Sequence, residues 1–314
     1  MPARTVTIFG GSGFLGRHLI KRLAARGYII RVPTRDPNRA LHLKPMGDVG
    51  QIVLERWDGS LEPSQMQRYL EGSSLVVNLV GILHERRAGD FTRLHAELPR
   101  ALAGLAREMG ARRLLHVSAL GADPASPSLY ARTKAEGEAA VCEGFPGATI
   151  FRPSIVFGPE DQFFNRFARM SQISPVLPVV GAKTRFQPVH VGDVGDAAVA
   201  ALESEDAAGT LYELGGPRIY SFEELLRYML RVLGRRRLVL ELPEGLARLI
   251  ARFAEWLPQP PLTRDQILLL ARDNVVSGAF PGLAELGAAA TPLEAIVPEY
   301  LTAYARPGPR ARFA

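Results

Sequence analysis

Short runs of β-branched and other apolar residues alternate along the chain with longer stretches whose apolar residues recur every three or four positions. Helical periodicity predicts one helix that begins near Gly13 and another over about 93–109. The apolar runs predict strands at residues 5–9, 28–35, 51–58, 75–81, 113–118 and 149–153, and a returning strand at 211–215. This regular alternation is typical of an α/β fold with a doubly wound parallel sheet.

Three glycines, Gly10, Gly13 and Gly16, lie at i, i+3 and i+6 between the first strand and the first helix. Glycine is needed where a chain turns sharply and where backbone N–H groups approach a pyrophosphate. The helix that follows points the positive end of its dipole at those phosphates. The stretch predicts a dinucleotide site, with Phe14 and Leu15 among the cofactor-binding residues. The alternative is a glycine-rich turn without a ligand.

The end of the second strand bears on which dinucleotide binds. An acid about 20 residues beyond the glycines holds the ribose hydroxyls of NAD in many such folds. Here the strand ends in Arg35, whose guanidinium suits a 2′-phosphate. Asp36 follows immediately and is able to face the ribose. We therefore favour NADP(H) over NAD(H).

A Tyr-x-x-x-Lys pair, Tyr130 and Lys134, supplies candidate chemistry. Residues i and i+4 share one helix face, so the phenol and the ammonium meet beside one ligand. The ammonium is expected to lower the tyrosine pKa and to make Tyr130 a proton donor near neutral pH. Ser118, which ends the strand at 113–118, is expected to hydrogen-bond the same substrate oxygen, and Lys134 also to hold the nicotinamide ribose. In the alternative interpretation, Tyr130 and Lys134 bind only the cofactor ribose.

The composition is that of a folded α/β protein with one large domain and a smaller appended one. The chain has 314 residues, of which 47% are hydrophobic and 22% are charged. Its single cysteine, Cys142, excludes an intramolecular disulfide and cysteine-rich zinc sites. The histidines show no metal-ligand spacing, so no metal site is expected.

The net charge of +6 raises the question of an acidic partner. The arginines are spread along helices without a nucleic-acid-binding signature, and the only compact cluster is at 235–237. We expect no nucleic acid, and favour an anionic membrane or an acidic protein. The apolar run at 75–83 is too short to span a bilayer, and no signal peptide fits before the first strand. A cytoplasmic protein is expected, with peripheral contact at the cytoplasmic face of the inner membrane as an open alternative.

The Gly-x-x-Gly-x-x-Gly spacing resembles the extended and atypical branches of the short-chain dehydrogenase/reductase superfamily. Residues 75–81 are similar to that superfamily's stretch beneath the cofactor, and residues 151–159 to the stretch whose backbone fixes the nicotinamide carboxamide. Residues 185–197 resemble the segment that joins its two domains, in which His190 is a packed structural histidine. The resemblance adds these cofactor-binding residues: Asp58 at the adenine, Val80, Gly81, Pro153 and Ile155.

Stretches outside these motifs resemble one family more closely. They cover residues 42–53, 161–168, 261–267, 280–287 and 291–294. Together they are similar to the nucleotide-binding accessory subunit of respiratory complex I and its bacterial homologues, over about residues 4–304. No amphipathic presequence precedes the first strand, which favours a bacterial origin.

The resemblance implies a Rossmann-type domain with a small, mostly helical C-terminal domain, and tightly held NADPH. It implies either stabilisation of complex I or a link to ubiquinone biosynthesis. The family's cofactor motifs match Gly10, Gly13, Gly16, Arg35, Tyr130 and Lys134.

The domain organisation follows from the same pattern. We expect a nucleotide-binding domain over residues 1–155, with a returning strand near 210–216, and an interleaved small domain over 156–314. Within the latter, residues 156–185 and 217–305 are predicted to be helical, above the carboxyl ends of the strands, where ligands bind. The Pro- and Arg-rich tail after Tyr304 is expected to fray.

Three functions remain open. The first is a structural NADP(H)-binding partner of a membrane respiratory complex or of quinone metabolism. The second is an active oxidoreductase on a quinone precursor or another hydrophobic carbonyl, using Ser118, Tyr130 and Lys134. The third is a nucleotide-sugar epimerase or dehydratase, which is disfavoured because the C-terminal half offers few partners for sugar hydroxyls.

Residues 243–257 predict an amphipathic helix. Arg248, Arg252 and Glu255 occupy one face. The other face carries Leu246, Leu249, Ile250, Phe253, Trp256 and Leu257. This pattern is typical of helices that bind a membrane surface. In the alternative interpretation the apolar face closes over the substrate domain.

Overall fold

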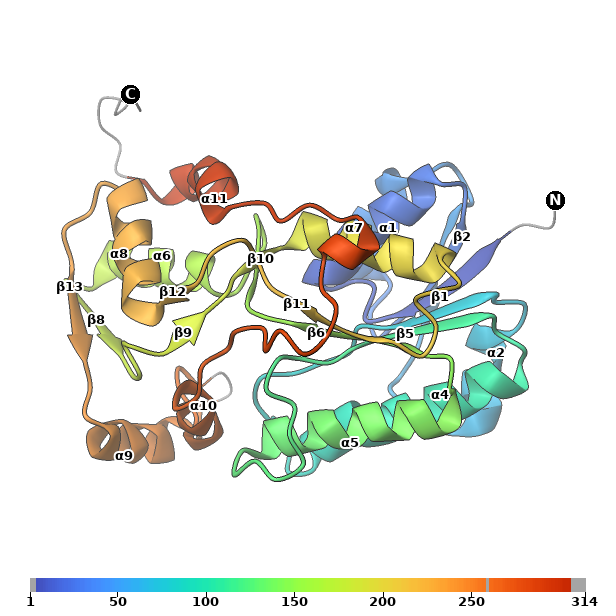
Figure 1. The fold of residues 1–314 in the computed structure, drawn as a ribbon, viewed down its shortest axis with the longest axis horizontal. Coiled ribbons are helices and arrows are strands. Elements are labelled where there is room, and N and C mark those ends of the chain that lie inside the picture. The colour runs from blue at the N-terminus through green and yellow to red at the C-terminus, as the bar shows by residue number, and fades with distance from the viewer. Residues whose placement is uncertain (1–3, 258–259, 306–314) are drawn as a thin grey trace.

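In the part of the chain that the computed structural model describes, residues 4–257 and 260–305, seven strands form one parallel sheet (Figure 1). They run in the order β11-β6-β5-β4-β1-β2-β3. The strands are β1 (Thr5–Phe9), β2 (Ile29–Thr34), β3 (Ile52–Arg56), β4 (Leu75–Asn78), β5 (Arg113–Val117), β6 (Thr149–Pro153) and β11 (Leu211–Leu214). The prediction of a doubly wound parallel sheet with a returning strand is confirmed.

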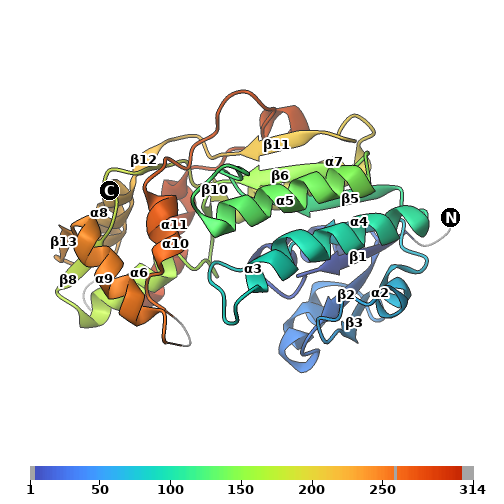
Figure 2. The same ribbon diagram turned by 90° about the horizontal axis from the view of Figure 1, so that it is seen from below.

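Helices cover both faces of this sheet (Figure 1). On one face α1 (Phe14–Ala25) packs against α7 (Val191–Glu203) over strand residues such as Ile8 and Ile30. The opposite face carries α2 (Pro63–Leu70), α4 (Leu98–Glu108) and α5 (Leu129–Gly144), and the last two lie side by side in Figure 2. Each helix buries one apolar stripe, so the sheet is enclosed by two separate hydrophobic layers.

A second hydrophobic core lies beyond the carboxyl ends of the strands, between α6 (Phe164–Ile173), α8 (Phe222–Val232) and α11 (Leu293–Leu301). Three two-stranded sheets border it. They pair β7 (Val156–Phe157) with β10 (Val189–His190), β9 (Arg185–Phe186) with β12 (Tyr220–Ser221), and β8 (Val176–Val179) with β13 (Leu238–Glu241). The segments 156–185 and 217–305, predicted to be helical, therefore carry short strands beside their helices. These strands have two to four residues and pair across long sequence separations, which local periodicity does not record.

The helix expected over 93–109 starts earlier and changes its winding. It begins as α3 (Asp90–Thr92), widens into the π-helical turn η2 (Arg93–Glu97), and continues as α4. π-turns inside α-helices are frequent at functional sites.

Five further helical elements complete the described part of the chain. They are η1 (Asn38–Met46), α9 (Glu244–Ala254), α10 (Arg264–Leu270), η3 (Ala284–Leu286) and η4 (Thr302–Tyr304). Within the described residues, no helix is both long and apolar enough to cross a membrane. The tail expected to fray lies, beyond Ala305, outside the described residues.

The strand order reverses between β1 and β4, because β2 and β3 extend from one side of β1 while β4 to β6 extend from the other. The carboxyl ends flanking such a reversal leave a crevice where α/β sheets bind nucleotides. The glycine turn after β1 and the loop after β4 both lie at this crevice.

Candidate functional site

The turn between β1 and α1 has the geometry that only glycine permits. Gly10 has φ +80°, and a Cβ there would lie 2.9 Å from the carbonyl carbon of Leu79. A Cβ on Gly16 would lie 2.3 Å from the oxygen of Gly11. Gly13 is the exposed N-cap of α1 and has no side chain to satisfy the first N–H groups of the helix. The turn therefore fits an anionic ligand at the start of α1.

The end of β2 exposes Arg35 and Asp36 to solvent. Asp36 Oδ1 accepts the backbone N–H groups of Asn38 and Arg39, at 3.0 and 3.3 Å, and so holds the start of η1. The carboxylate that is able to face a ribose is thus engaged by the backbone. Arg39, which sequence reasoning missed, adds a second exposed guanidinium four residues beyond Arg35.

Asp58 is exposed just beyond the carboxyl end of β3, and its Oδ1 accepts the N–H of Ser60 at 2.8 Å. Its backbone position therefore lies at the same edge of the sheet as the glycine turn. A turn-forming hydrogen bond already occupies one oxygen of its carboxylate.

Ser118, Lys134 and Gly81 come together where β4 and β5 end. The buried Ser118 Oγ has no hydrogen-bond partner among the described residues. Lys134 Nζ donates to the carbonyl oxygen of Val117 at 3.3 Å, and a Cβ on Gly81 would lie 3.3 Å from that Nζ. Burial lowers the pKa of Lys134 to about 8, although the Glu138 carboxylate raises it. An unpaired hydroxyl and a buried ammonium thus lie beside the carboxyl ends of the central strands.

Tyr130 lies on α5 between aromatic rings and the same ammonium. Its ring makes edge-on contacts with Phe91 and His95, at centroid distances of 5.8 and 5.2 Å, and Lys134 Nζ lies 5.9 Å from its centroid. Burial raises the pKa of Tyr130 to about 12, and the carboxylate of Asp265 adds to the rise. The predicted net lowering of the Tyr130 pKa is wrong, because burial of the phenol sets its direction. Tyr130 is therefore a protonated phenol at neutral pH, which suits a donor of a proton.

His95, for which the sequence predicted no role, contacts the Tyr130 ring and also Thr133 on the same helix, α5. Its Nε2 accepts the N–H of Ile82 at 3.2 Å, and its Nδ1 lies 3.2 Å from Thr133 Oγ1. Burial lowers the pKa of His95 to about 3, so the ring is neutral, and Nε2 as acceptor leaves the proton on Nδ1. The π-turn η2 carries this histidine, so a neutral imidazole connects the loop after β4 to α5.

Asp265 on α10 binds the N-terminus of α5 and was also missed. Its carboxylate accepts Ser128 Oγ–H at 2.8 Å and the backbone N–H groups of Leu129 and Tyr130 at 2.7 and 3.2 Å. Anions at a helix N-terminus compensate the macrodipole. The helix that presents Tyr130 is thus held by a residue 135 positions later in the chain.

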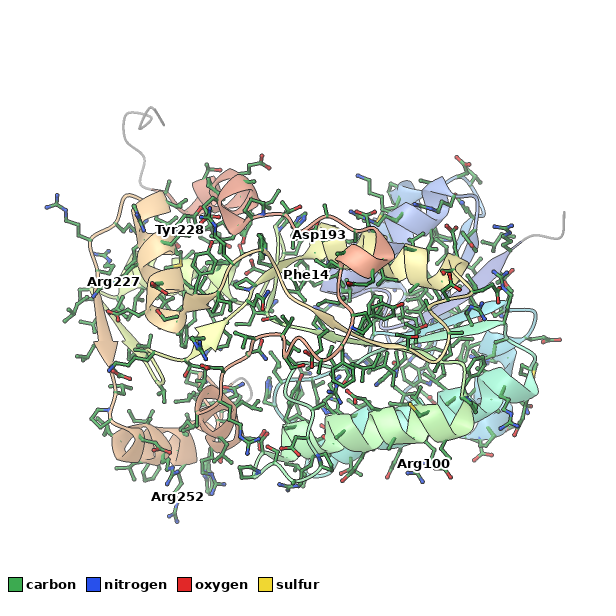
Figure 3. The ribbon with its side chains drawn as sticks, viewed as in Figure 1. Phe14, Arg100, Asp193, Arg227, Tyr228 and Arg252 are labelled. Atoms are coloured by element: carbon green, nitrogen blue, oxygen red, sulfur yellow. The ribbon has the colours of Figure 1, made fainter. Side chains whose placement is uncertain are left out.

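The remaining predicted cofactor residues lie around the same crevice. Leu15 lies in the first turn of α1. Phe14, labelled near the centre of Figure 3, is adjacent to the loop after β7, since a Cβ on Gly158 would lie 3.3 Å from its ring. Val80 donates its N–H to Asn78 Oδ1 at 3.1 Å. At the end of β6, the carbonyl oxygen of Pro153 accepts the N–H of Leu120. The carbonyl oxygen of Ile155, two residues later, accepts the N–H of Val189.

His190 lies away from Tyr130, at the start of α7. Its ring packs on Phe157 with 5.5 Å between centroids, and its Nδ1 lies 3.5 Å from Asp193 Oδ1. Asp193 also accepts two hydrogen bonds from Thr291. These contacts are those of a packed histidine at the junction between the sheet and the C-terminal segment.

Two shallow surface hollows, of about 400 and 420 Å³, lie against the outer side of α5 and over α4. Neither is lined by the glycine turn, Ser118, Tyr130 or Lys134. The candidate site therefore rests on the convergence of polar groups at the strand ends, and not on the volume of an enclosed cavity.

Comparison with known proteins shows what this chain is similar to. Residues 6–215 match the NAD dependent epimerase/dehydratase family, a span that includes the glycine turn, Ser118, Tyr130 and Lys134. The structure of a Citrobacter triphenylmethane reductase is 19% identical and aligns with a TM-score of 0.75, over 95% of this chain and 99% of that one. At that identity the match concerns the fold alone.

Two curated proteins are more similar in sequence. The mitochondrial NADH dehydrogenase (ubiquinone) 1 alpha subcomplex subunit 9 of Rattus norvegicus is 36% identical over 291 residues, covering 92% of this chain and 77% of the subunit. A protein named ceramide reductase from Caulobacter vibrioides is 34% identical over 247 residues, covering 76% of this chain and 74% of that protein. Both matches extend beyond the nucleotide-binding motifs into the C-terminal half.

Proposed function

Since the chain belongs to the NAD dependent epimerase/dehydratase family and, within it, to the family of complex I accessory subunits, we propose that it is an NADP(H)-binding partner of NADH:ubiquinone oxidoreductase or of quinone metabolism. The family match supports a short-chain dehydrogenase/reductase-like fold that binds a dinucleotide. We propose in addition a preference for NADP(H), a link to quinones and a position at the cytoplasmic face of the inner membrane.

The observation that carries the cofactor proposal is the arrangement at the end of β2. Arg35 is exposed, while Asp36 is held by two backbone N–H groups. A 2′-phosphate there meets a guanidinium fork, while one oxygen of the neighbouring Asp36 is engaged by the backbone, which favours NADP(H). We assign nucleotide binding to residues 1–155 with the strand near 210–216, and the remaining contacts to the interleaved segment 156–314.

The partner proposal is tested by purifying the tagged full-length chain from membranes of its own host under mild detergent. We expect subunits of NADH:ubiquinone oxidoreductase to comigrate with it on a native gel, and NADP(H) to be released when it is denatured. A matched preparation of Gly13→Asp, which places a carboxylate at the phosphate turn, is expected to lose the nucleotide. Migration of the wild-type chain apart from every complex I subunit would refute the partnership without touching the cofactor assignment.

A second function, reduction of a hydrophobic carbonyl, is favoured by the unpaired Ser118 hydroxyl beside Lys134. A merely structural subunit has no need of a buried hydroxyl without a partner, which costs desolvation free energy. The similarity to a protein named ceramide reductase supports the same direction.

In this reduction each residue has a separate role. A reduced nicotinamide held by the glycine turn and Lys134 would supply a hydride to the carbonyl carbon. Tyr130 gives its Oη proton to the carbonyl oxygen, so that a C=O becomes a CH–OH, and Ser118 Oγ–H donates a hydrogen bond to that oxygen. With a pKa of about 8, Lys134 is mostly protonated at pH 7, and its charge stabilises the phenolate that Tyr130 becomes.

Tyr130→Phe separates this function from mere binding. It keeps the ring contacts with Phe91 and His95 and removes only the proton donor. With NADPH and a long-chain ketone as substrate, we expect turnover to fall at least a hundredfold while NADPH affinity changes less than threefold. Tyr212→Phe, on β11, is the matched control and is expected to keep full turnover. A Tyr130→Phe protein as active as wild type would exclude Tyr130 as the acid.

A further inference from the structure

Exposed apolar side chains are concentrated in one short segment. Of the fifteen large apolar residues exposed in the described part of the chain, eight lie within 238–257. We call the six on and just after α9 the α9 face: Leu246, Leu249, Ile250, Phe253, Trp256 and Leu257. Leu238 and Leu240 on the preceding strand β13 are exposed as well. Such a concentration marks an interaction surface.

α9 turns its small residues inward. Ala247 and Ala251 are fully buried and pack with Val180 and Ile267, whereas Trp256 is 90% exposed and Phe253 69% exposed. The alternative in which the large apolar face closes over the substrate domain is therefore wrong, because alanines make that contact. α9 therefore has two apolar faces. The alanine face packs on the protein, and the α9 face has no partner within the described chain.

Within the described residues, the charged side chains of α9 and its end leave one arginine without an ion pair. Arg248 pairs with Glu244 at 2.6 Å, and Glu255 pairs with Arg264 at 2.9 Å, so both carboxylates of the helix region are neutralised. No described carboxylate lies within 4 Å of Arg252, which Figure 3 labels at the outer side of α9. An apolar face flanked by an unbalanced arginine complements an anionic surface.

The arginine cluster at 235–237 contributes less than the sequence suggests. The side chain of Arg235 donates to the carbonyl oxygen of Tyr304 at 3.0 Å, and that of Arg237 to Ser171 at 2.8 Å. Only Arg236 is exposed, on the same side of the strand as Leu238 and Leu240. The basic residues available to a partner are therefore Arg236 and Arg252.

α9 is linked through α10 to the loop near the candidate site. α9 packs on α10, and α10 contacts α5 (Figure 1). On α10, Gln266 Nε2 donates to the carbonyl oxygen of Leu83 at 3.2 Å, and Leu83 is itself an exposed apolar residue two positions after Gly81. α10 therefore joins α9 to the loop that carries Leu83.

We propose that α9 docks onto the surface of an anionic lipid bilayer, with its axis in the membrane plane and the α9 face buried at the boundary between headgroups and acyl chains. Both views place α9 beside β13 at the end of the molecule that lies away from β1–β3 (Figure 1 and Figure 2). Helices that bind at a membrane interface have this composition: leucine and isoleucine on one face, tryptophan and phenylalanine at one end, and arginines at the flank. A second copy of the chain is the competing occupant.

The chain provides its own optical probe for this docking. It has two tryptophans, of which Trp57 is buried and Trp256 is almost fully exposed. On titration of the full-length protein with vesicles of phosphatidylglycerol and phosphatidylcholine at low salt, we expect the Trp256 emission to shift to shorter wavelength and the protein to float with the vesicles. Pure phosphatidylcholine vesicles and 0.5 M salt are each expected to reduce binding at least tenfold.

Variants separate docking from folding. Phe253→Ser/Trp256→Ser is expected to weaken binding at least tenfold at unchanged thermal midpoint, because both side chains are exposed. Arg252→Gln is expected to weaken it about fivefold on anionic vesicles. The matched control Leu41→Ser/Val49→Ser removes two exposed apolar residues from the nucleotide-binding half and is expected to bind as wild type.

Three results would overturn the proposal. The first is failure of the wild-type chain to float with anionic vesicles at low salt. The second is an equal loss of binding in the Leu41/Val49 control. The third is a dimer in light scattering that the Phe253/Trp256 double variant converts to a monomer without any lipid binding, which would make the α9 face an interface between copies.

Discussion

Removing the carboxylate of Asp265 should loosen the helix that presents Tyr130. The half-buried Asp265 accepts three hydrogen bonds at the N-terminus of α5, from Ser128 Oγ–H and from the N–H groups of Leu129 and Tyr130. A hydrogen bond to a charged group contributes about 1.5–3 kcal/mol, and a carboxylate at a helix N-terminus up to about 1 kcal/mol more. Water replaces part of this loss at a half-exposed site. We therefore expect Asp265→Ala to lower the free energy of unfolding by about 2–4 kcal/mol.

Urea unfolding at pH 7 with linear extrapolation measures the difference. Asp265→Asn keeps an acceptor and loses only the charge, so about 1 kcal/mol is expected. Asp273→Ala is the matched control, because Asp273 pairs with Arg185 at the surface and should cost less than about 1 kcal/mol. If Asp265→Ala unfolds within 0.5 kcal/mol of wild type, the carboxylate does not hold α5 and the coupling between α10 and α5 is refuted.

The same variant tests the electrostatics of Tyr130. Since burial is the larger cause of the raised pKa and the Asp265 carboxylate the second, Asp265→Asn should lower the pKa of Tyr130 below about 12 without restoring its ordinary value of 10.0. Phenolate absorbance, with a Tyr130→Phe/Asp265→Asn protein as background, follows this group alone. An unchanged titration would contradict the assigned cause.

Two further predictions concern how residues of the candidate site change the free energy of unfolding. The pKa of Lys134 falls from 10.5 to about 8 on folding, so the unfolded chain holds this proton more tightly and stability is lost as the pH falls from about 10 to 8. Lys134→Met should therefore raise the free energy of unfolding at pH 7 by about 2–3 kcal/mol while weakening NADPH binding. A Lys134→Met protein that is less stable than wild type in urea would contradict this. Gly16→Ala should lower the free energy of unfolding by about 3 kcal/mol, because its Cβ clashes with the oxygen of Gly11. The control Gly104→Ala, in open space on α4, should be neutral or stabilise the protein by up to about 1 kcal/mol. Equal thermal midpoints for the two alanine variants would refute the steric argument.

Local pattern predicted the sheet because each of its strands is a short apolar run followed by a turn. The glycine triplet, Arg35 and the Tyr130–Lys134 pair follow from spacing alone, since they lie within one βα unit or one helix turn. The structure places all of them at the carboxyl edge of the sheet or on α5. Their roles toward a nucleotide stay predictions, because the geometry fits those roles without testing them.

Long-range contacts account for what the sequence did not predict. Asp265 joins Ser128 across 137 residues, and β13 pairs with β8 across 62 positions. No periodicity encodes such pairings. The direction of the Tyr130 pKa was missed for a related reason: adjacency to Lys134 follows from spacing, whereas desolvation depends on Phe91, His95 and α10 packing around the ring.

The orientation of α9 was left open by the sequence for another reason. Its periodicity defines two faces but not which of them meets the protein, and the buried alanines Ala247 and Ala251 decide the question only in three dimensions. A helix with leucines on one side is ordinarily turned inward. Here the larger side chains point outward, and that difference is what carries the membrane proposal.

Calorimetric titration of the full-length chain with NADPH and NADH tests the central claim most directly. A charge-assisted fork between Arg35 and a 2′-phosphate contributes about 1.5–3 kcal/mol, so wild type should bind NADPH at least tenfold more tightly. Arg35→Ala should abolish that preference while leaving NADH affinity unchanged, and Arg112→Ala, which removes an exposed arginine at the amino end of β5, should retain it. Equal affinities of the wild-type chain for the two nucleotides, or a preference that survives Arg35→Ala, would contradict the account.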